Sequence, residues 1–212
     1  MKEINIIGEN TVFIEKTVKL GKGITIYPGN VVLGKTKILD GVILYPNNYI
    51  VDSEIGKGAE ISQSCLEGVI VGEKTKVGPF SRIRPNTIIG KNCKIGNFVE
   101  VKNSVIGDNV KASHLAYIGD AEIGNDVNIG CGAIFVNYNG KIKNKIKVGE
   151  NAFIGSNVNL IAPLEVAKNT YICAGTTLTK NTENGDFVIG RERETIKKNL
   201  AKKYLKTFNK GD

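Results

Sequence analysis

The chain has 212 residues, of which 41% are hydrophobic, and a formal net charge of +8. This apolar content is enough for a sizeable core in one or two domains, which excludes disorder of the whole chain. Apolar residues never run uninterrupted for the length that a membrane-spanning helix needs, so we expect no membrane segment. The positive charge suggests an anionic partner, but the chain lacks Trp and its Tyr and Phe are scattered, which disfavours nucleic acid.

The cysteines and the N-terminus indicate the compartment. Cys65, Cys93, Cys131 and Cys173 form no C-x-x-C pair, and the first residues contain no long apolar run. We therefore expect reduced thiols, no signal peptide and a cytoplasmic location.

Aliphatic residues recur with a six-residue period through most of the chain, interrupted by a few shorter steps. They are Ile14, Leu20, Ile26, Val32, Ile38, Leu44, Ile50, Ile55, Leu66, Val71, Val77, Ile83, Ile89, Ile95, Val101, Ile106, Ala112, Ile118, Ile123, Ile129, Phe135, Val148, Ile154, Leu160, Val166, Ile172 and Leu178. Six is a multiple of the strand period of two but not of the helical 3.6, so these side chains face one side of short strands. Three strands and three corners close a triangular coil, and the repeat gives about nine coils stacked about 4.8 Å apart. The pattern therefore predicts an all-β parallel solenoid, without fixing its hand.

Two segments break the period. Residues 136–147 contain NYNGKIKNK, which predicts a loop extruded from the coil, a place where solenoids carry function. After Leu178 the repeat ends, so we divide the chain into a solenoid domain at 1–190 and a basic arm at 191–212. Within the arm, Ile196, Leu200 and Tyr204 have helical spacing, which predicts a short amphipathic helix, more readily a cap on the open end of the solenoid than a binding element.

The chain has one histidine, His114. A lone histidine is more often structural than catalytic, but His114 lies two positions after Ala112 and should point outward, and a neutral imidazole is a suitable base for an amine nucleophile. One histidine cannot supply the three His ligands of a zinc hydrolase, so we expect no metal. Cys131, two positions after Ile129, should lie one coil away from His114. Its backbone N–H is a candidate oxyanion donor, and its thiol is more readily a small buried hydrophobe than a nucleophile.

Arg84 and Lys102 each follow a periodic aliphatic residue and are eighteen positions apart. They should stack on adjacent coils, where two cations favour an anion such as phosphate between them. Lys143, in the extruded loop, could add a third charge. On spacing alone, scattered surface cations explain these residues equally well.

Several motifs resemble a known family: GPFSRIRP, GNFVEVKNS, SHLAYIGDAEIGNDVNIG, NYNGK, FIGSN, LIAPLEV and AGTT. Together they resemble the acetyltransferase domain of the bifunctional bacterial enzyme that makes UDP-N-acetylglucosamine. The tandem [LIV]-G-x-x-[STAV]-x pattern is similar to that of hexapeptide-repeat acyltransferases, which implies a left-handed parallel β-helix. The Gly-rich signature of the nucleotidyltransferase half has no counterpart in this sequence. Two alternatives follow: a separate acetyltransferase, for which another protein would have to form UDP-N-acetylglucosamine, or a fragment of a bifunctional enzyme.

The resemblance also implies an activity: transfer of acetyl from acetyl-CoA to the amine of glucosamine 1-phosphate, in a homotrimer with sites shared between subunits. The implied general base is His114, and the implied sugar-phosphate residues are Arg84, Lys102, Tyr117, Asn128 and Lys143. The residues assigned to the acetyl-CoA end are Cys131, Asn137, Tyr138, Ser156, Ala174 and Arg191. Two alternatives stay open: the same chemistry on another amino sugar or nucleotide sugar, and a solenoid that binds without catalysing.

Overall fold

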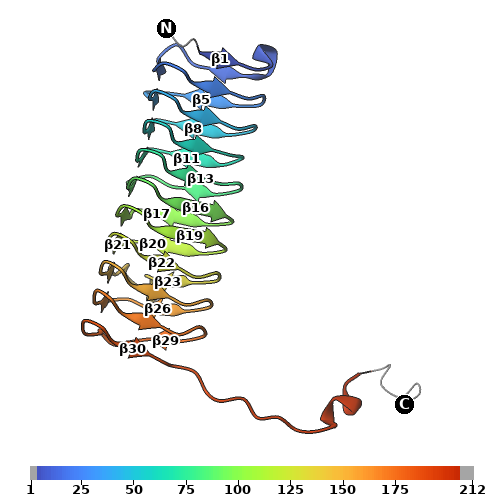
Figure 1. The fold of residues 1–212 in the computed structure, drawn as a ribbon, viewed down its shortest axis with the longest axis vertical. Helices are drawn as coiled ribbons and strands as arrows, with labels where there is room; N and C mark the ends of the chain where they lie inside the picture. The colour runs from blue at the N-terminus through green and yellow to red at the C-terminus, as the bar shows by residue number, and fades with distance from the viewer. Residues whose placement is uncertain (1–3, 206–212) are drawn as a thin grey trace.

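The computed structural model describes residues 4–205, which form a column of short strands stacked coil upon coil (Figure 1). The strands make three parallel sheets of 11, 10 and 9 strands, and nearly every strand pairs with strands three places away in the chain. A short 3-10 helix, η1 (Glu9–Thr11), lies near the start. Three sheets around one axis are the triangular solenoid that the six-residue period predicts.

Successive strands belong to different sheets. Sheet A contains β1 (Asn5–Ile6), β4 (Thr25–Ile26), β7 (Ile43–Leu44), β10 (Glu60–Ile61), β13 (Lys76–Val77), β16 (Lys94–Asn97), β19 (Lys111–His114), β22 (Asn128–Ile129), β25 (Phe153–Ile154), β28 (Tyr171–Ile172) and β30 (Phe187–Val188). Sheet B contains β2 (Phe13–Ile14), β5 (Val31–Leu33), β8 (Tyr49–Val51), β11 (Cys65–Glu67), β14 (Arg82–Ile83), β17 (Glu100–Lys102), β20 (Tyr117–Gly119), β23 (Ile134–Val136), β26 (Asn159–Ile161) and β29 (Thr177–Leu178). Sheet C contains β3 (Lys19–Leu20), β6 (Lys37–Ile38), β9 (Glu54–Ile55), β12 (Val69–Val71), β15 (Thr87–Ile89), β18 (Val105–Ile106), β21 (Ala121–Ile123), β24 (Ile146–Val148) and β27 (Leu164–Val166).

The periodic aliphatic side chains form the core. All of those from Ile26 to Leu178 are buried, while Ile14 and Leu20 at the N-terminal end are partly buried. The periodic series skips the strand position of Ile61, which is fully buried and in register with Val77 of the next coil. Burying each aliphatic side chain contributes about 1.5 to 3 kcal/mol before chain entropy is counted. The six-residue prediction of the core is therefore confirmed.

The corners between strands require a left-handed backbone. Many corner residues have positive φ, and most of those that are not glycine are Asn or Asp, such as Asn86 (φ 62°) and Asn109 (φ 60°). Asn and Asp tolerate this conformation better than other side chains do, because their short polar groups can bond locally. Three bulky apolar residues break this rule at one corner, and they bear on the assembly below.

A loop joins β23 and β24 in the region where the six-residue period breaks. Strand β23 ends at Val136 and β24 begins at Ile146. Between them Tyr138 and Lys143 form an antiparallel bridge, and the Asn144 N–H donates to the carbonyl of Asn137 at 2.7 Å. The loop is thus a small hairpin held to the wall of the column rather than an open excursion.

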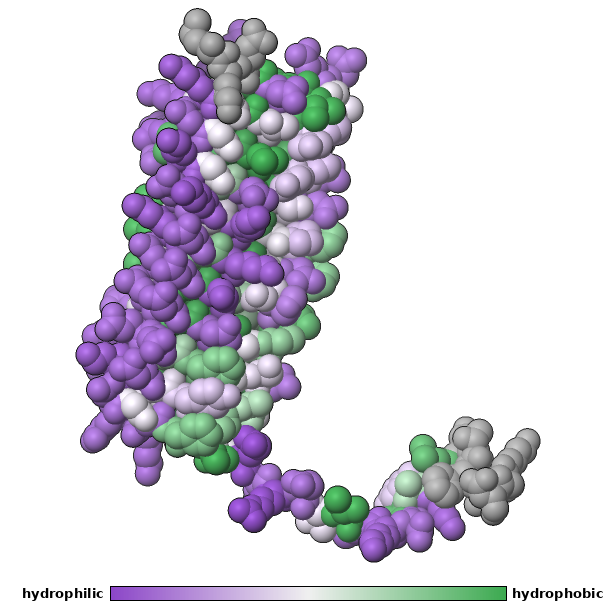
Figure 2. Space-filling model, viewed as in Figure 1, coloured by the Kyte–Doolittle hydropathy of each residue, from purple (hydrophilic) through white to green (hydrophobic). Residues whose placement is uncertain are grey.

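The expectation for the arm was largely wrong. Up to Leu205 the arm contains only a four-residue 3-10 helix, η2 (Leu200–Lys203), and it leaves the column instead of capping it (Figures 1 and 2). Its described residues are exposed, so no apolar face is buried. A short helix without tertiary packing is marginal in water, which explains why helical spacing alone did not produce one. Residues 206–212 of the arm lie outside the described residues. No helix within residues 4–205 is long and apolar enough to cross a membrane.

Candidate active site

His114 is exposed at the end of β19, on the corner between sheets A and B. Its Nδ1 lies 2.9 Å from Oδ1 of Asn97, which ends the neighbouring strand β16. The register pairs the two residues directly. The outward placement predicted for His114 is therefore confirmed, whereas Asn97 was missed by the sequence analysis.

A straight ladder of residues runs from His114 toward the C-terminal end. Because Ala112 pairs with Ile129 and Ile129 with Ile154, the residues two positions after them, His114, Cys131 and Ser156, are aligned. The pairing of Ile154 with Ile172 adds Ala174. The Arg191 side chain reaches this end, where its Nη1 donates to the carbonyl of Ala174 at 3.0 Å. At about 4.8 Å per coil, the ladder from His114 to Ala174 is about 14 Å long.

Cys131 lies beside His114 as its spacing predicted, but its side chain is exposed, so the expectation of a small buried hydrophobe was wrong. The reason is the corner: the chain turns outward after Gly130, and a Cβ on that glycine would lie 2.6 Å from backbone atoms of the next coil. Its backbone N–H makes no hydrogen bond among the described residues. The N–H remains available as a donor.

The predicted cations converge at the other edge of sheet B. Arg84, Lys102 and Lys143 line one pocket of about 410 Å³ together with Asp120 and Asn103. The remaining lining residues are Pro85 and Asn86. The Arg84 N–H donates to the carbonyl of Val101, which confirms the predicted stacking of Arg84 beside Lys102. The structure therefore brings the three predicted cations together around one pocket instead of scattering them over the surface.

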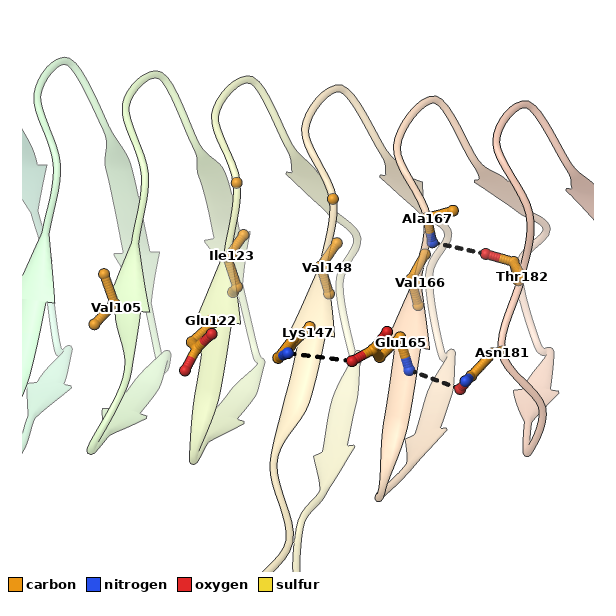
Figure 3. A pocket seen from close by; sticks show the side chains of 12 residues that line it. Val105, Glu122, Ile123, Lys147, Val148, Glu165, Val166, Ala167, Asn181 and Thr182 are labelled. Atoms are coloured by element: carbon orange, nitrogen blue, oxygen red, sulfur yellow. Dashed lines mark hydrogen bonds and ion pairs between the residues drawn. The ribbon is translucent and has the colours of Figure 1, made fainter.

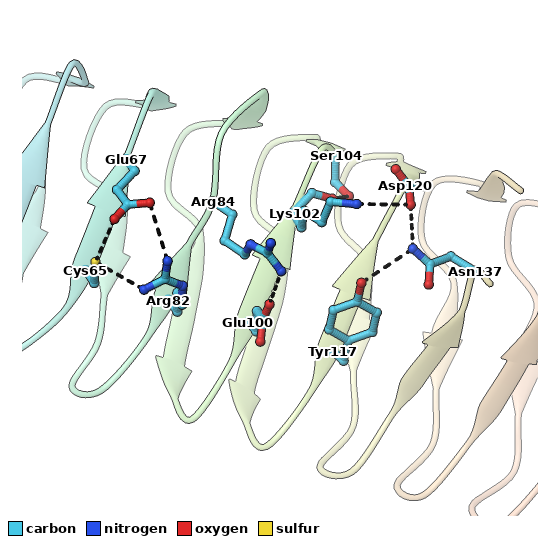
Figure 4. A network of polar contacts seen from close by, with 10 residues as sticks. All are labelled: Cys65, Glu67, Arg82, Arg84, Glu100, Lys102, Ser104, Tyr117, Asp120 and Asn137. Atoms are coloured by element: carbon cyan, nitrogen blue, oxygen red, sulfur yellow. Dashed lines mark hydrogen bonds and ion pairs between the residues drawn. The ribbon is translucent and has the colours of Figure 1, made fainter. Parts of the chain in front are cut away.

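Acidic and amide groups hold these cations in place (Figure 4). Arg84 Nη1 lies 2.9 Å from Glu100 Oε1, and Lys102 Nζ lies 3.7 Å from Asp120 Oδ2. The ammonium of Lys102 also lies beside that of Lys143 and lowers the pKa of Lys143. Three cations against two carboxylates leave one excess positive charge, so an anion would relieve the repulsion.

Asp120 is the centre of this network, with a side chain only 8% exposed. It accepts hydrogen bonds from the side-chain amides of Asn103 and Asn137. Burial by itself raises the pKa of Asp120, but the two amide bonds and the charges of Lys102 and Lys143 outweigh it and hold the pKa below its usual value. The carboxylate is thus ionised at neutral pH and fixes Lys102 in the pocket.

We expect Asp120→Asn to destabilise the protein by about 2 kcal/mol at neutral pH, because buried charged hydrogen bonds contribute about 1.5 to 3 kcal/mol. Since the folded pKa is lowered, this contribution is complete above the ordinary Asp value and is lost as pH falls through the folded value. Thermal unfolding of both proteins at pH 7 and at about pH 3 checks this. The difference in Tm should shrink in acid; an equal difference at both values would contradict the assignment.

Tyr117 and Asn137 complete the network. The Asn137 amide nitrogen bonds Asp120 and lies 3.4 Å from the Tyr117 hydroxyl. A Cβ at Gly119 would lie 2.5 Å from that hydroxyl, so glycine there makes room for the ring. Asn137 is buried and does not lie on the ladder of Cys131, Ser156 and Ala174, the residues assigned with it to the acetyl-CoA end. Within one chain its amide contacts Asp120 and Tyr117 instead.

Two predicted residues stand apart. Asn128 lies on sheet A, paired with Lys111, and lines a different groove from the Arg84 pocket. Tyr138 is exposed in the extruded loop, where its hydroxyl donates to the carbonyl of Gly140 at 2.8 Å. Within a single chain, neither residue lies at the Arg84 pocket or on the ladder.

A pocket of about 630 Å³ lies on sheet C (Figure 3). Its wall consists of aliphatic side chains and paired charges such as Lys147 and Glu165, 3.2 Å apart. None of the predicted site residues lines it. Within the described residues, no three His, Cys, Asp or Glu side chains are grouped to hold a metal ion.

Sequence comparison relates this chain to curated proteins named bifunctional protein GlmU. The chain is 49% identical over 204 residues to that of Clostridium novyi, and the match covers 96% of this chain and 45% of that protein. The chain is homologous to their C-terminal region. The protein from Clostridioides difficile is 49% identical over 200 residues, 94% of this chain and 44% of that protein. The chain thus spans less than half the length of these relatives, and the resemblance drawn from the motifs is confirmed.

A family model described as the GMPPB C-terminal domain matches residues 65–134. Among solved structures, the chain is similar to LpxA, a UDP-N-acetylglucosamine acyltransferase from Bacteroides fragilis, at 19% identity and a TM-score of 0.53, over 81% of this chain and 66% of that chain. It is also similar to the Francisella novicida UDP-N-acetylglucosamine acyltransferase, at 16% identity and a TM-score of 0.51, over 84% of this chain and 63% of that chain. These likenesses show the fold, a left-handed parallel β-helix.

Proposed function

We propose that this chain transfers the acetyl group of acetyl-CoA to the amine of glucosamine 1-phosphate, as the acetyltransferase half that its motifs resemble. The observation that carries the proposal is the joint placement of an exposed, oriented His114 and a pocket of three cations on the two edges of sheet B. Tyr117 lies on β20, which connects those edges. The similarity to the C-terminal region of GlmU supports the same activity.

The phosphate is the part of the acceptor that the pocket recognises. Arg84 presents a planar fork of donors and Lys102 and Lys143 present compact charges, a combination that suits a phosphate. On binding, the phosphate replaces Glu100 as the partner of Arg84 or shares it. The sugar ring then extends toward Tyr117 and the amine toward the His114 edge.

The donor lies along the ladder. Cys131, Ser156 and Ala174 present one straight edge that ends at the Arg191 guanidinium, and an extended pantetheine arm fits such an edge with its thioester at His114 and its phosphates at Arg191. In the reaction His114 Nε2 takes a proton from the amine as the nitrogen attacks the thioester carbonyl. The Cys131 N–H donates to the developing oxyanion, and the CoA thiolate leaves. No metal is needed for these steps.

The direct test is release of free CoA thiol from acetyl-CoA in the presence of a panel of amino sugars. We expect turnover with glucosamine 1-phosphate and little with glucosamine, because the cation pocket binds only the phosphorylated sugar. Turnover of a phosphate-free sugar or of a nucleotide amino sugar at equal efficiency would select the second interpretation. Absence of turnover with every acceptor, together with tight binding of one, would select the non-catalytic solenoid.

We further propose that the active form is a homotrimer in the cytoplasm. The support comes from the corner that carries His114: Phe80, Phe98 and Leu115 have φ of 59°, 58° and 44° and are all more than half exposed. Bulky side chains are strained in this backbone conformation. The rings of Phe80 and Phe98 stack with their centroids 5.6 Å apart and are exposed to solvent. A second copy packed on this ridge would cover it and would bring its own residues next to His114. Asn128 and Tyr138, which one chain leaves apart from the site, could then join it.

We therefore expect Phe98→Asp to dissociate the trimer, because a charge replaces an apolar ring at the centre of the ridge. Analytical ultracentrifugation should show the wild type at three times the mass of the chain and the variant at a lower mass with lost activity. Phe13→Asp, at an exposed aromatic residue near the N-terminal end, is the matched control and should leave the trimer intact. A fully active monomer would overturn the shared site.

A further inference from the structure

The strands that carry His114 and Asn97 are longer than the others. Among residues 4–205, β16 (Lys94–Asn97) and β19 (Lys111–His114) are the two strands of four residues, whereas the rest have two or three. The extension is what brings Asn97 and His114 into register. It requires Gly96, since a Cβ there would lie 1.9 Å from the carbonyl oxygen of Ser113. The pairing of Asn97 with His114 therefore depends on a local extension of these two strands and on the glycine that permits it.

The contact determines which nitrogen of the imidazole carries a proton. An amide oxygen has no hydrogen to give, so the 2.9 Å contact between Asn97 Oδ1 and His114 Nδ1 requires the proton on Nδ1. The lone pair is then on Nε2, the nitrogen that points away from Asn97. A neutral imidazole held in this tautomer is ready to accept a proton, and a ring held at its other nitrogen keeps its direction.

We propose that Asn97 is a positioning residue that fixes the tautomer and the orientation of His114 for proton abstraction from the acceptor amine. The inference rests on the proposed function and goes beyond it, because it assigns a role to a residue that does not itself contact the reacting atoms. It also explains why the partner is an amide. A carboxylate at this place would stabilise the imidazolium and so keep the base occupied by a proton at neutral pH.

No acidic side chain is paired with the imidazole of His114 in the described part of the chain. The charged and titratable side chains on the strands and corners next to it are Lys94, Lys111, Cys131, Tyr117, Glu100 and Lys102. Of these, Glu100 is paired with Arg84 and Lys102 with Asp120. Among residues 4–205, the side chain that hydrogen-bonds the ring is the amide of Asn97.

Two substitutions at this position test the inference. Asn97→Ala should lower kcat by about tenfold to a hundredfold, the cost of a misplaced catalytic group, with both KM values within about twofold of wild type. Asn97→Asp keeps the acceptor oxygen and adds a charge. It should recover most of kcat at high pH and move the acidic limb of the kcat/KM profile upward by about one pH unit. The matched control is Asn169→Asp. Asn169 is an exposed asparagine at another corner that accepts a hydrogen bond from Asn151, and its substitution should leave the pH profile of kcat/KM unchanged.

A second readout does not depend on turnover. Because the chain has one histidine, 15N-labelled histidine gives a single imidazole whose nitrogen shifts report the tautomer and its titration. We expect the Nδ1–H form in the wild type, a mixture in Asn97→Ala, and a titration midpoint at higher pH in Asn97→Asp. Unchanged shifts in both variants, or a kcat for Asn97→Ala above half of wild type, would overturn the role of Asn97. Failure of the wild type to acetylate any amino sugar would instead overturn the proposed function, while the tautomer result would stand.

Discussion

Substitution of His114 by alanine should abolish acetyl transfer while the protein stays folded and trimeric. General base catalysis contributes about 10²- to 10⁴-fold, and the chain has no second imidazole to take over the proton. The side chain is exposed and its one polar partner is Asn97, so its loss removes no core packing. The expected rate is below a few percent of wild type, measured as thiol release at saturating acetyl-CoA and acceptor.

The matched control for this experiment is Cys131→Ala, one coil away on the same edge. The proposed contribution of Cys131 is its backbone N–H, which alanine retains, so this variant should keep at least half of the wild-type rate. Sedimentation of both variants checks that each remains assembled. A His114→Ala protein that retained more than a few percent activity would place the base elsewhere, and an inactive Cys131→Ala protein would make the thiol itself a participant.

The fold was predictable from the sequence because the solenoid repeats one local rule. An aliphatic residue at every sixth position marks the side chains that face the core. The same period places outward residues of adjacent coils in register, so the stacking of Arg84 on Lys102 could be predicted from their spacing of eighteen residues. The periodic series skipped Ile61, which lies where shorter steps interrupt the period. The hand of the coil did not follow from the period and came from the resemblance.

The site was predictable only in part. Residue type and spacing singled out His114, Arg84, Lys102 and Lys143 as candidates, but their roles came from the resemblance. Asn97 was missed because the coil between it and His114 has a shorter step, so the two paired residues are seventeen positions apart and not eighteen. The contact of Asn137 with Asp120 was not predicted, because residues of an extruded loop have no repeat register that fixes their neighbours. The expected amphipathic helix of the arm is absent up to Leu205 for a different reason. A short helix is stable only where its apolar side packs against another surface, and within residues 4–205 the side chains of the arm are exposed.

Arg84→Ala should raise the KM for glucosamine 1-phosphate by about ten- to a hundredfold and leave the KM for acetyl-CoA nearly unchanged. A charge-assisted hydrogen bond contributes about 1.5 to 3 kcal/mol, and each 1.4 kcal/mol is about tenfold in affinity. The structure adds a second cause. Glu100 Oε1 lies 2.9 Å from Arg84 Nη1, so removing the guanidinium leaves an unpaired carboxylate facing the incoming phosphate.

This second cause can be separated from the first. The double variant with Arg84→Ala and Glu100→Gln should recover part of the lost affinity, because the glutamine removes the repulsion without restoring the contact. Arg82→Ala is the matched control: Arg82 lies two residues earlier on β14, pairs with Glu67 at 3.4 Å and does not line the pocket. Its KM values should match those of the wild type. If Arg84→Ala weakened both substrates equally, or if Arg82→Ala had the same effect on the sugar phosphate, general surface charge would explain the binding and the phosphate pocket would be wrong.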